Sequence, residues 1–179
     1  MSSFLYWIYD GYLLIDQFME SGGVMLWWIA ALTLTMWVLL LERFIYFKGE
    51  LNDDLASALN RWESLPERKS WQAHQIRDAI ISQVKVKIGS NLNFIQTLVM
   101  LAPLLGLMGT VTGMIEVFNI LAVTGGGDAK SMAGGVSKAT LPTMAGMVAA
   151  LSGVFAQIYI NKIANTQSEL LKDRLTVDH

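Results

Sequence analysis

Three stretches of this 179-residue chain are rich in apolar residues and carry no charged side chain. They cover residues 21–41, 88–115 and 139–161. A helix needs about 20 residues to cross the roughly 30 Å hydrocarbon core of a bilayer, because it rises about 1.5 Å per residue. The pattern therefore predicts an all-α integral membrane protein with three transmembrane helices. A soluble fold around three buried helices is disfavoured, since a chain this short provides too small a polar shell.

The remaining residues predict helices outside the bilayer. An aromatic-rich amphipathic helix at the N terminus is expected on the outward-facing surface of the membrane. Two cytoplasmic helices are expected, one before and one after Pro66. The loop and extensions of transmembrane helices 2 and 3 would then form a cytoplasmic helical region. The predicted segments are the surface helix (1–23), transmembrane helix 1 (24–46), a cytoplasmic helical segment (47–93), transmembrane helix 2 with a cytoplasmic extension (94–123), a periplasmic link (124–131), transmembrane helix 3 (132–163) and a cytoplasmic tail (164–179).

The distribution of Lys and Arg predicts the orientation. Residues 1–23 contain neither, and the link after the second apolar run contains only Lys130. In contrast, residues 42–90 contain eight. By the positive-inside rule, the N terminus and the link face outward, and the middle segment and the C-terminal tail are cytoplasmic.

The second and third apolar runs differ from the first in their small residues. The first is bulky and lacks Gly and Pro after residue 23, so we expect it to face lipid. Small residues three or four apart let two helix backbones approach closely. Because one chain has too few helices to use all these faces, they predict a ring of copies with spans two and three inside. The residues expected to pack in this way are Ala102, Gly106, Gly109, Gly113, Gly146, Ala150 and Gly153.

Four polar residues fall at two levels of the predicted membrane region. Spans two and three are antiparallel, so Thr110 lies at the depth of Thr143, and Glu116 lies at the depth of Lys138. We hypothesise an ion pair between Glu116 and Lys138, within or between subunits, because unpaired charges in a membrane are costly. Alternatively, both charges reach the membrane surface, and each threonine only bonds to its own helix backbone.

Composition excludes several classes of function. Thirteen Lys and Arg against fifteen Asp and Glu give a net charge of −2, so no basic surface suggests nucleic-acid binding. The chain has no cysteine and two histidines, which leaves few ligands for a metal site. The glycine-rich run at 125–131 is not a phosphate-binding loop, because Ala129 stands where a glycine must precede the lysine. Neither an enzyme, a cofactor nor a metal ion is expected.

Two segments carry a resemblance to a known family. Residues 102–118 read APLLGLMGTVTGMIEVF, and residues 136–161 read VSKATLPTMAGMVAALSGVFAQIYIN. Together with the sequence Leu41-Glu42-Arg43 after the first span, they resemble the ExbB/TolQ branch of the MotA/TolQ/ExbB proton-channel family. This resemblance implies a homopentamer in the bacterial inner membrane. Helices of a single-span partner of the ExbD or TolR type, which carries a protonatable aspartate, would lie inside its pore.

The resemblance also implies roles for individual residues. Thr110 and Thr143 match the pore-facing threonines of the family, which would hydrogen-bond to the partner's carboxyl group or to water that supplies it. Many relatives have a glutamate near the start of span three, where this chain has Lys138. A proton role at that position is therefore not carried over.

The resemblance favours an ExbB-like subunit that couples proton flow to an energy transducer of the TonB type for outer-membrane import. A TolQ-like subunit of the Tol envelope system and a passive scaffold for the partner proteins are the alternatives. The flagellar stator branch usually has a fourth span and a larger cytoplasmic insert, and this chain has neither.

Overall fold

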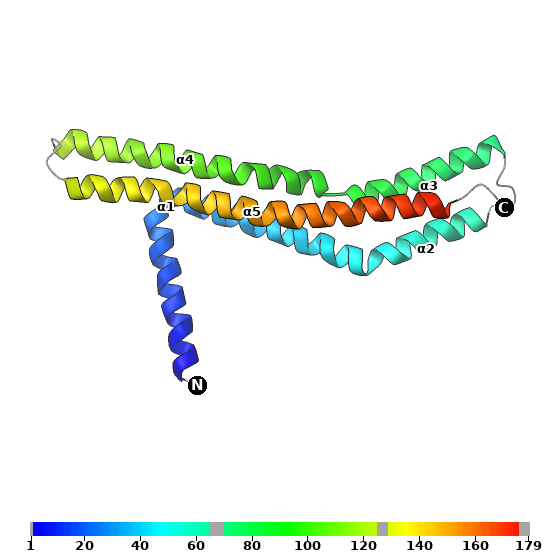
Figure 1. Cartoon of the computed structure of the whole chain (residues 1–179), viewed down its shortest axis with the longest axis horizontal. Coiled ribbons are helices and arrows are strands. Elements are labelled where there is room, and N and C mark those ends of the chain that lie inside the picture. Colours follow the sequence, from blue (N-terminus) through cyan, green and yellow to red (C-terminus); the bar gives the residue numbers. More distant parts are fainter. Residues whose placement is uncertain (1, 65–69, 125–128, 176–179) are drawn as a thin grey trace. The chain divides into compact units, whose positions relative to one another are not determined.

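The computed structural model describes residues 2–64, 70–124 and 129–175, with side chains described for 9–64, 70–123 and 133–175. Five helices make up the described chain, with no strand among those residues (Figure 1). This confirms the all-α prediction. The helices are α1 (Ser2–Lys48), α2 (Glu50–Glu63), α3 (Trp71–Gly89), α4 (Leu92–Thr124) and α5 (Ala129–Arg174).

Three helical stretches are long and apolar enough to cross a membrane. They are Tyr9–Lys48, Trp71–Val123 and Ala133–Arg174, and each contains one of the three charge-free runs. The predicted three-span architecture is confirmed by these helices.

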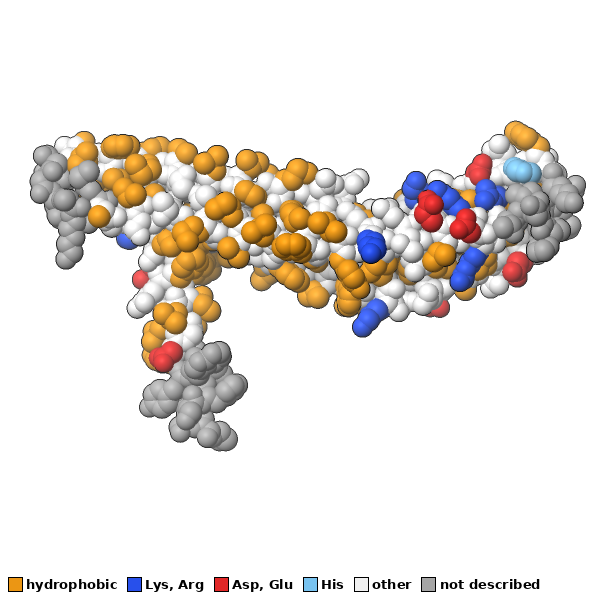
Figure 2. All heavy atoms as spheres, viewed as in Figure 1, with side chains coloured by type: hydrophobic (Ala, Val, Ile, Leu, Met, Phe, Trp, Pro, Cys, Tyr) orange, Lys and Arg blue, Asp and Glu red, His pale blue; other side chains and the backbone are white. Residues whose placement is uncertain are grey.

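The helices divide into two compact units. Unit 1 contains Met1–Thr35 and Leu98–Gly153, and unit 2 contains Met36–Thr97 and Val154–His179. Helices α1, α4 and α5 contribute residues to both units. Apolar side chains dominate the visible surface of unit 1, whereas charged side chains gather on unit 2 (Figure 2).

Unit 1 consists mainly of the antiparallel pair of α4 and α5 together with α1 (Figure 1). Its small buried cluster is Ile29, Ala102, Ala149 and Ala150. Three of these four residues are alanines, so helix backbones rather than large side chains meet in the interior. Most large apolar residues of this unit therefore point outward, which suits a lipid environment or contact with other subunits.

Helix α1 bends at Gly23, where φ is 64° and ψ is −161°. This left-handed backbone region carries a steric cost for residues with a Cβ atom, and glycine avoids that cost. The bend lies at the predicted break between the N-terminal helix and the first span. Helical residues precede the bend from Ser2 onward.

Unit 2 has the larger apolar core. Helices α2, α3 and the C-terminal part of α5 supply it, and Trp62 is its largest member. Helix α3 begins after Ser70, whose side chain accepts a hydrogen bond from the Ala73 amide at 3.2 Å. The predicted break at Pro66 lies outside the described residues, between α2 and α3. The buried residues of this core are Leu51, Ala58, Trp62, Ala73, Ile80, Val84, Ile88, Ala164, Leu171 and Leu175.

Candidate functional site

The small residues of α4 and α5 pack against each other within one chain. A Cβ atom added at Gly146 would lie 2.5 Å from the Ala102 carbonyl oxygen, and one at Gly106 would lie 2.9 Å from the Pro142 carbonyl oxygen. Gly113 is similarly close to Ala139. These glycines therefore find partners within one chain, so their small size does not by itself require a ring of copies. Since α4 and α5 are antiparallel neighbours, the glycine face of each helix meets the other.

The other predicted packing residues follow the same pattern. Gly109 would collide with the Pro142 ring if it carried a Cβ atom. Ala102 and Ala150 are buried in the cluster of unit 1, and Gly153 is buried as well. Ala102, Gly106, Gly109, Gly113 and Gly146 thus lie where α4 and α5 meet, whereas a packing role of Ala150 and Gly153 between these two helices stays a prediction.

The two threonines predicted at one level make different hydrogen bonds. The Thr143 hydroxyl donates to the Gly106 carbonyl oxygen at 2.9 Å and so links α5 to α4. The Thr110 hydroxyl donates to the Leu107 carbonyl oxygen of its own helix at 2.7 Å. Both side chains are partly exposed. Each hydroxyl oxygen keeps a lone pair that can accept a hydrogen bond from a protonated acid or from water.

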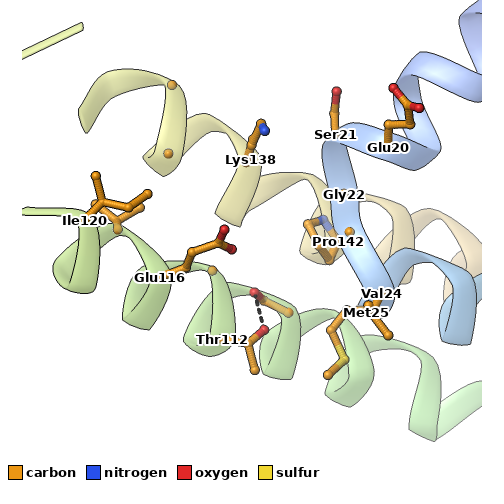
Figure 3. Close-up of a pocket in the computed structure, with 16 residues that line it drawn as sticks. Glu20, Ser21, Gly22, Val24, Met25, Thr112, Glu116, Ile120, Lys138 and Pro142 are labelled. Carbon is orange, nitrogen blue, oxygen red and sulfur yellow. Dashed lines mark hydrogen bonds between the residues drawn. The ribbon is translucent and has the colours of Figure 1, made fainter. Parts of the chain in front are cut away.

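A cavity of about 570 Å³ lies in unit 1 at the end where α1 bends. Helices α1, α4 and α5 all line it, and Glu116 and Lys138 are both among the lining residues (Figure 3). Glu116 extends from α4 toward α5, while Lys138 extends from α5 to the side away from α4 (Figure 3). Within the described residues, no ion pair joins Glu116 to Lys138. Pairing between Glu116 and Lys138 stays a prediction.

A polar network in unit 2 follows the end of the first span. The buried Arg43 guanidinium donates to the Lys87 carbonyl oxygen at 3.2 Å and pairs with Glu42 at 2.9 Å. Asn91 donates to Glu42 at 3.3 Å. Asn91 has a φ of 62° and lies between the end of α3 and the start of α4. The network therefore ties the end of α1 to the break between these two helices.

The same network continues into α2 through Asp54. One oxygen of Asp54 accepts from Lys87 Nζ at 2.7 Å, and the other accepts from the Tyr46 hydroxyl at 2.8 Å. These two hydrogen bonds, that from Lys87 foremost, lower the pKa of the Asp54 carboxyl below its ordinary value. From the sequence, Glu42 and Arg43 stand out only as part of the family resemblance, and the contacts of Asp54 with Lys87 and Tyr46 are not predicted. Partners that lie 33 and 8 residues from Asp54 give no local signal.

Metal chemistry finds no support in the described ranges. Among those residues, no group of three or more His, Asp or Glu side chains lies close enough to hold a metal ion, and the chain has no cysteine. Along the two helices, the charged residues nearest to the threonines in sequence are Glu116, six residues after Thr110, and Lys138, five residues before Thr143.

Comparison with known proteins matches most of the chain to one family. A family model described as the MotA/TolQ/ExbB proton channel family matches residues 48–173. The matched region includes α2, α3, α4 and nearly all of α5. It therefore contains the glycine faces, both threonines and the cavity residues of α4 and α5.

Individual relatives are similar over shorter stretches. The chain is 42% identical over 78 residues to putative biopolymer transport protein ExbB-like 1 of Synechocystis, covering 42% of this chain and 30% of that protein. It is 30% identical over 89 residues to biopolymer transport protein ExbB of Helicobacter pylori, covering 50% of this chain and 61% of that protein. A second Helicobacter pylori protein, putative biopolymer transport protein ExbB-like 1, is 28% identical over 141 residues, covering 72% of this chain and 74% of that protein.

Proposed function

We propose that this chain, which belongs to the MotA/TolQ/ExbB proton channel family, is an ExbB-like subunit. In this role it couples proton flow to movement of a partner protein. The family is one of membrane proton channels and not a class of enzymes. The helices that can cross a membrane make the chain a multi-pass membrane protein. We place it in the bacterial inner membrane with its N terminus in the periplasm, as the distribution of Lys and Arg predicts.

The observation that carries this proposal is the joined pair of α4 and α5 with Thr110 and Thr143 on it. Gly106, which accepts the Thr143 hydrogen bond, lies one helical turn before Thr110, so both hydroxyls belong to one level of the pair. No acidic residue occurs in the charge-free runs 88–115 and 139–161. A proton path at this level therefore needs an acid from another protein.

That requirement specifies the partner. We propose a single-span, ExbD-like protein whose transmembrane acid lies against the threonine level, inside a homopentamer of this chain. A TonB-like energy transducer would take up the resulting movement. One proton that moves down 100 mV supplies about 2.3 kcal/mol, so a movement of the partner that costs more than this needs several protons. The relatives named as biopolymer transport proteins support an assignment to transport.

The test is proton flux through the purified complex in liposomes. We expect Thr110→Ala and Thr143→Ala to reduce proton flux about tenfold or more. Each variant would lose a hydrogen bond between its hydroxyl and the partner's carboxyl group, in the charged or the protonated form of that group. Thr112→Ala is the matched control, since Thr112 is an exposed threonine whose hydroxyl bonds only to its own helix. The partner should still co-purify with all three variants.

Two results would contradict this proposal. Unchanged flux in both Thr110→Ala and Thr143→Ala, with intact assembly, would favour a passive scaffold. A co-purified complex without any single-span protein that carries an intramembrane acid would remove the proton carrier. If such a partner is found, its periplasmic sequence distinguishes service in the Ton system from service in the Tol system.

A further inference from the structure

The cavity of unit 1 is walled by residues that leave room for a ligand. Six glycines line it, so much of its wall consists of backbone. A Cβ atom added at Gly23 or Gly134 would meet no atom within 4 Å, which shows that these two positions border open space. The volume of about 570 Å³ is in the range of small-molecule binding sites. The six glycines are Gly22, Gly23, Gly109, Gly113, Gly134 and Gly135.

Charges of both signs line this cavity without a protein partner. Glu116 and Lys138 are exposed, and within the described part of the chain neither makes an ion pair or a side-chain hydrogen bond. Lys138 and Ser21 extend to the same side, whereas Glu116 extends from the opposite helix toward α5 (Figure 3). Glu20, on the last turn of α1 before the bend, is the third charged residue of the lining. A ligand there meets one ammonium group and two carboxylates.

The residues after the bend indicate the depth of the cavity in the membrane. Trp27 and Trp28 follow the lining residues Val24 and Met25 within one helical turn, and their exposed fractions are 64% and 59%. Exposed tryptophans are typical of the boundary between hydrocarbon and head groups, where the ring is apolar and the N–H group reaches water. The cavity therefore opens at the level of the lipid head groups.

We propose that this cavity binds the head group of a phospholipid that carries both a phosphodiester and a primary ammonium group. Lys138 binds the phosphate, to which the Ser21 hydroxyl of the lining can also donate, and Glu116 binds the ammonium group. A simple anion would leave the Glu116 carboxylate unpaired, and a simple cation would leave Lys138 unpaired. A zwitterion satisfies both, and Glu20 adds to the attraction for its ammonium end. This inference does not rest on the proposed function.

The unchanged protein provides the first test. The complex is purified in detergent, stripped of lipid, and titrated with phosphatidylethanolamine, phosphatidylglycerol or phosphatidylcholine while bound lipid is counted by native mass spectrometry. We expect phosphatidylethanolamine to bind about tenfold more tightly than the other two. Phosphatidylglycerol lacks the ammonium group, and the quaternary ammonium group of phosphatidylcholine has no N–H to donate. Equal binding of all three lipids would overturn the proposal.

Variants provide the second test. Lys138→Gln and Glu116→Gln should each weaken binding of phosphatidylethanolamine about tenfold, while Lys162→Gln, an exposed lysine elsewhere on α5, should leave it unchanged. Retained binding in both cavity variants would contradict the assignment. If water-soluble phosphoethanolamine binds as tightly as the lipid, the ligand is a soluble compound and the lipid assignment is wrong. The proposal would also be overturned if Glu116 or Lys138 cross-linked to a second copy of the chain and no lipid was bound there.

Discussion

At the scale of single residues, Thr110 and Thr143 lie at one level of the α4–α5 pair but make different hydrogen bonds. The Thr143 hydroxyl bonds to the facing helix, whereas the Thr110 hydroxyl bonds to its own helix. The difference arises from Gly106, since a backbone without a side chain lets α5 come within hydrogen-bond distance of an α4 carbonyl group. Thr143 therefore has a structural role in α4–α5 packing, beside the role in proton transfer that we propose for it.

Asp54 predicts a pH dependence of stability in unit 2. Its lowered pKa means that the folded protein holds fewer protons than the unfolded chain near the ordinary Asp value of 3.8. The resulting stabilisation is complete above that value and is lost as the pH falls through the lower, folded-state pKa. On acidification below about pH 4, we therefore expect the free energy of unfolding to fall further for the unchanged protein than for Asp54→Asn.

Denaturant unfolding in detergent at a series of pH values measures this effect. The control is Asp173→Asn, which removes an exposed carboxylate from the same unit and should follow the unchanged protein. Parallel pH curves for the unchanged protein and Asp54→Asn would show that the Lys87 and Tyr46 bonds do not stabilise the folded state.

At the scale of elements, the contact between α4 and α5 depends on glycine only where the backbones meet. Gly146 faces the Ala102 carbonyl oxygen, whereas nothing lies within 4 Å of the position of a Cβ atom at Gly134 on the same helix. The two glycines look alike in sequence, and both lie inside α5. Their environments make opposite predictions for the same substitution.

We expect Gly146→Ala to destabilise the protein by about 1–3 kcal/mol, because the new methyl group would press on a backbone atom that cannot rotate away. Gly134→Ala should instead be neutral or stabilise α5 by up to about 1 kcal/mol, because alanine is the better helix former. Unfolding free energies of the two variants in detergent provide the comparison. Equal effects of the two changes would mean that α4 and α5 do not pack as closely as described.

At the scale of the whole molecule, unit 1 has little interior and a large apolar surface. Several large side chains of this unit on α4 and α5 are more than half exposed, among them Phe118 at 59% and Leu151 at 58%. Lipid covers such faces in a monomer, and neighbouring subunits cover part of them in an oligomer. Because the glycine faces are already used within the chain, contact between copies would involve these bulkier outer faces.

Native mass spectrometry of the purified protein tests this arrangement. We expect an assembly of five times the chain mass of 19.8 kDa, which the unchanged protein retains and which weakens with Phe118→Ala in unit 1. Leu170→Ala, which changes an exposed apolar residue near the end of α5 in unit 2, is the comparison. A protein that stays monomeric in every mild detergent would contradict the pentamer and, with it, the shared pore.

Sequence by itself determined the helical class and the three spans, because charge-free runs of sufficient length have few alternatives to a membrane helix. It also determined the family, through the residues of the segments 102–118 and 136–161. It further placed the boundary between the N-terminal helix and the first span after residue 23, where α1 bends. These features depend on residues close together in the chain, so local chemistry is enough to predict them.

Tertiary structure alone decided which distant residues meet. It assigned Gly106, Gly113 and Gly146 to contacts within one chain, and it joined Asp54 to Lys87 and Tyr46. Helical periodicity indicates which face of a helix is small or polar but not which neighbour that face contacts. That choice depends on how the helices pack, because the closest approach of two backbones is set by all the side chains between them at once.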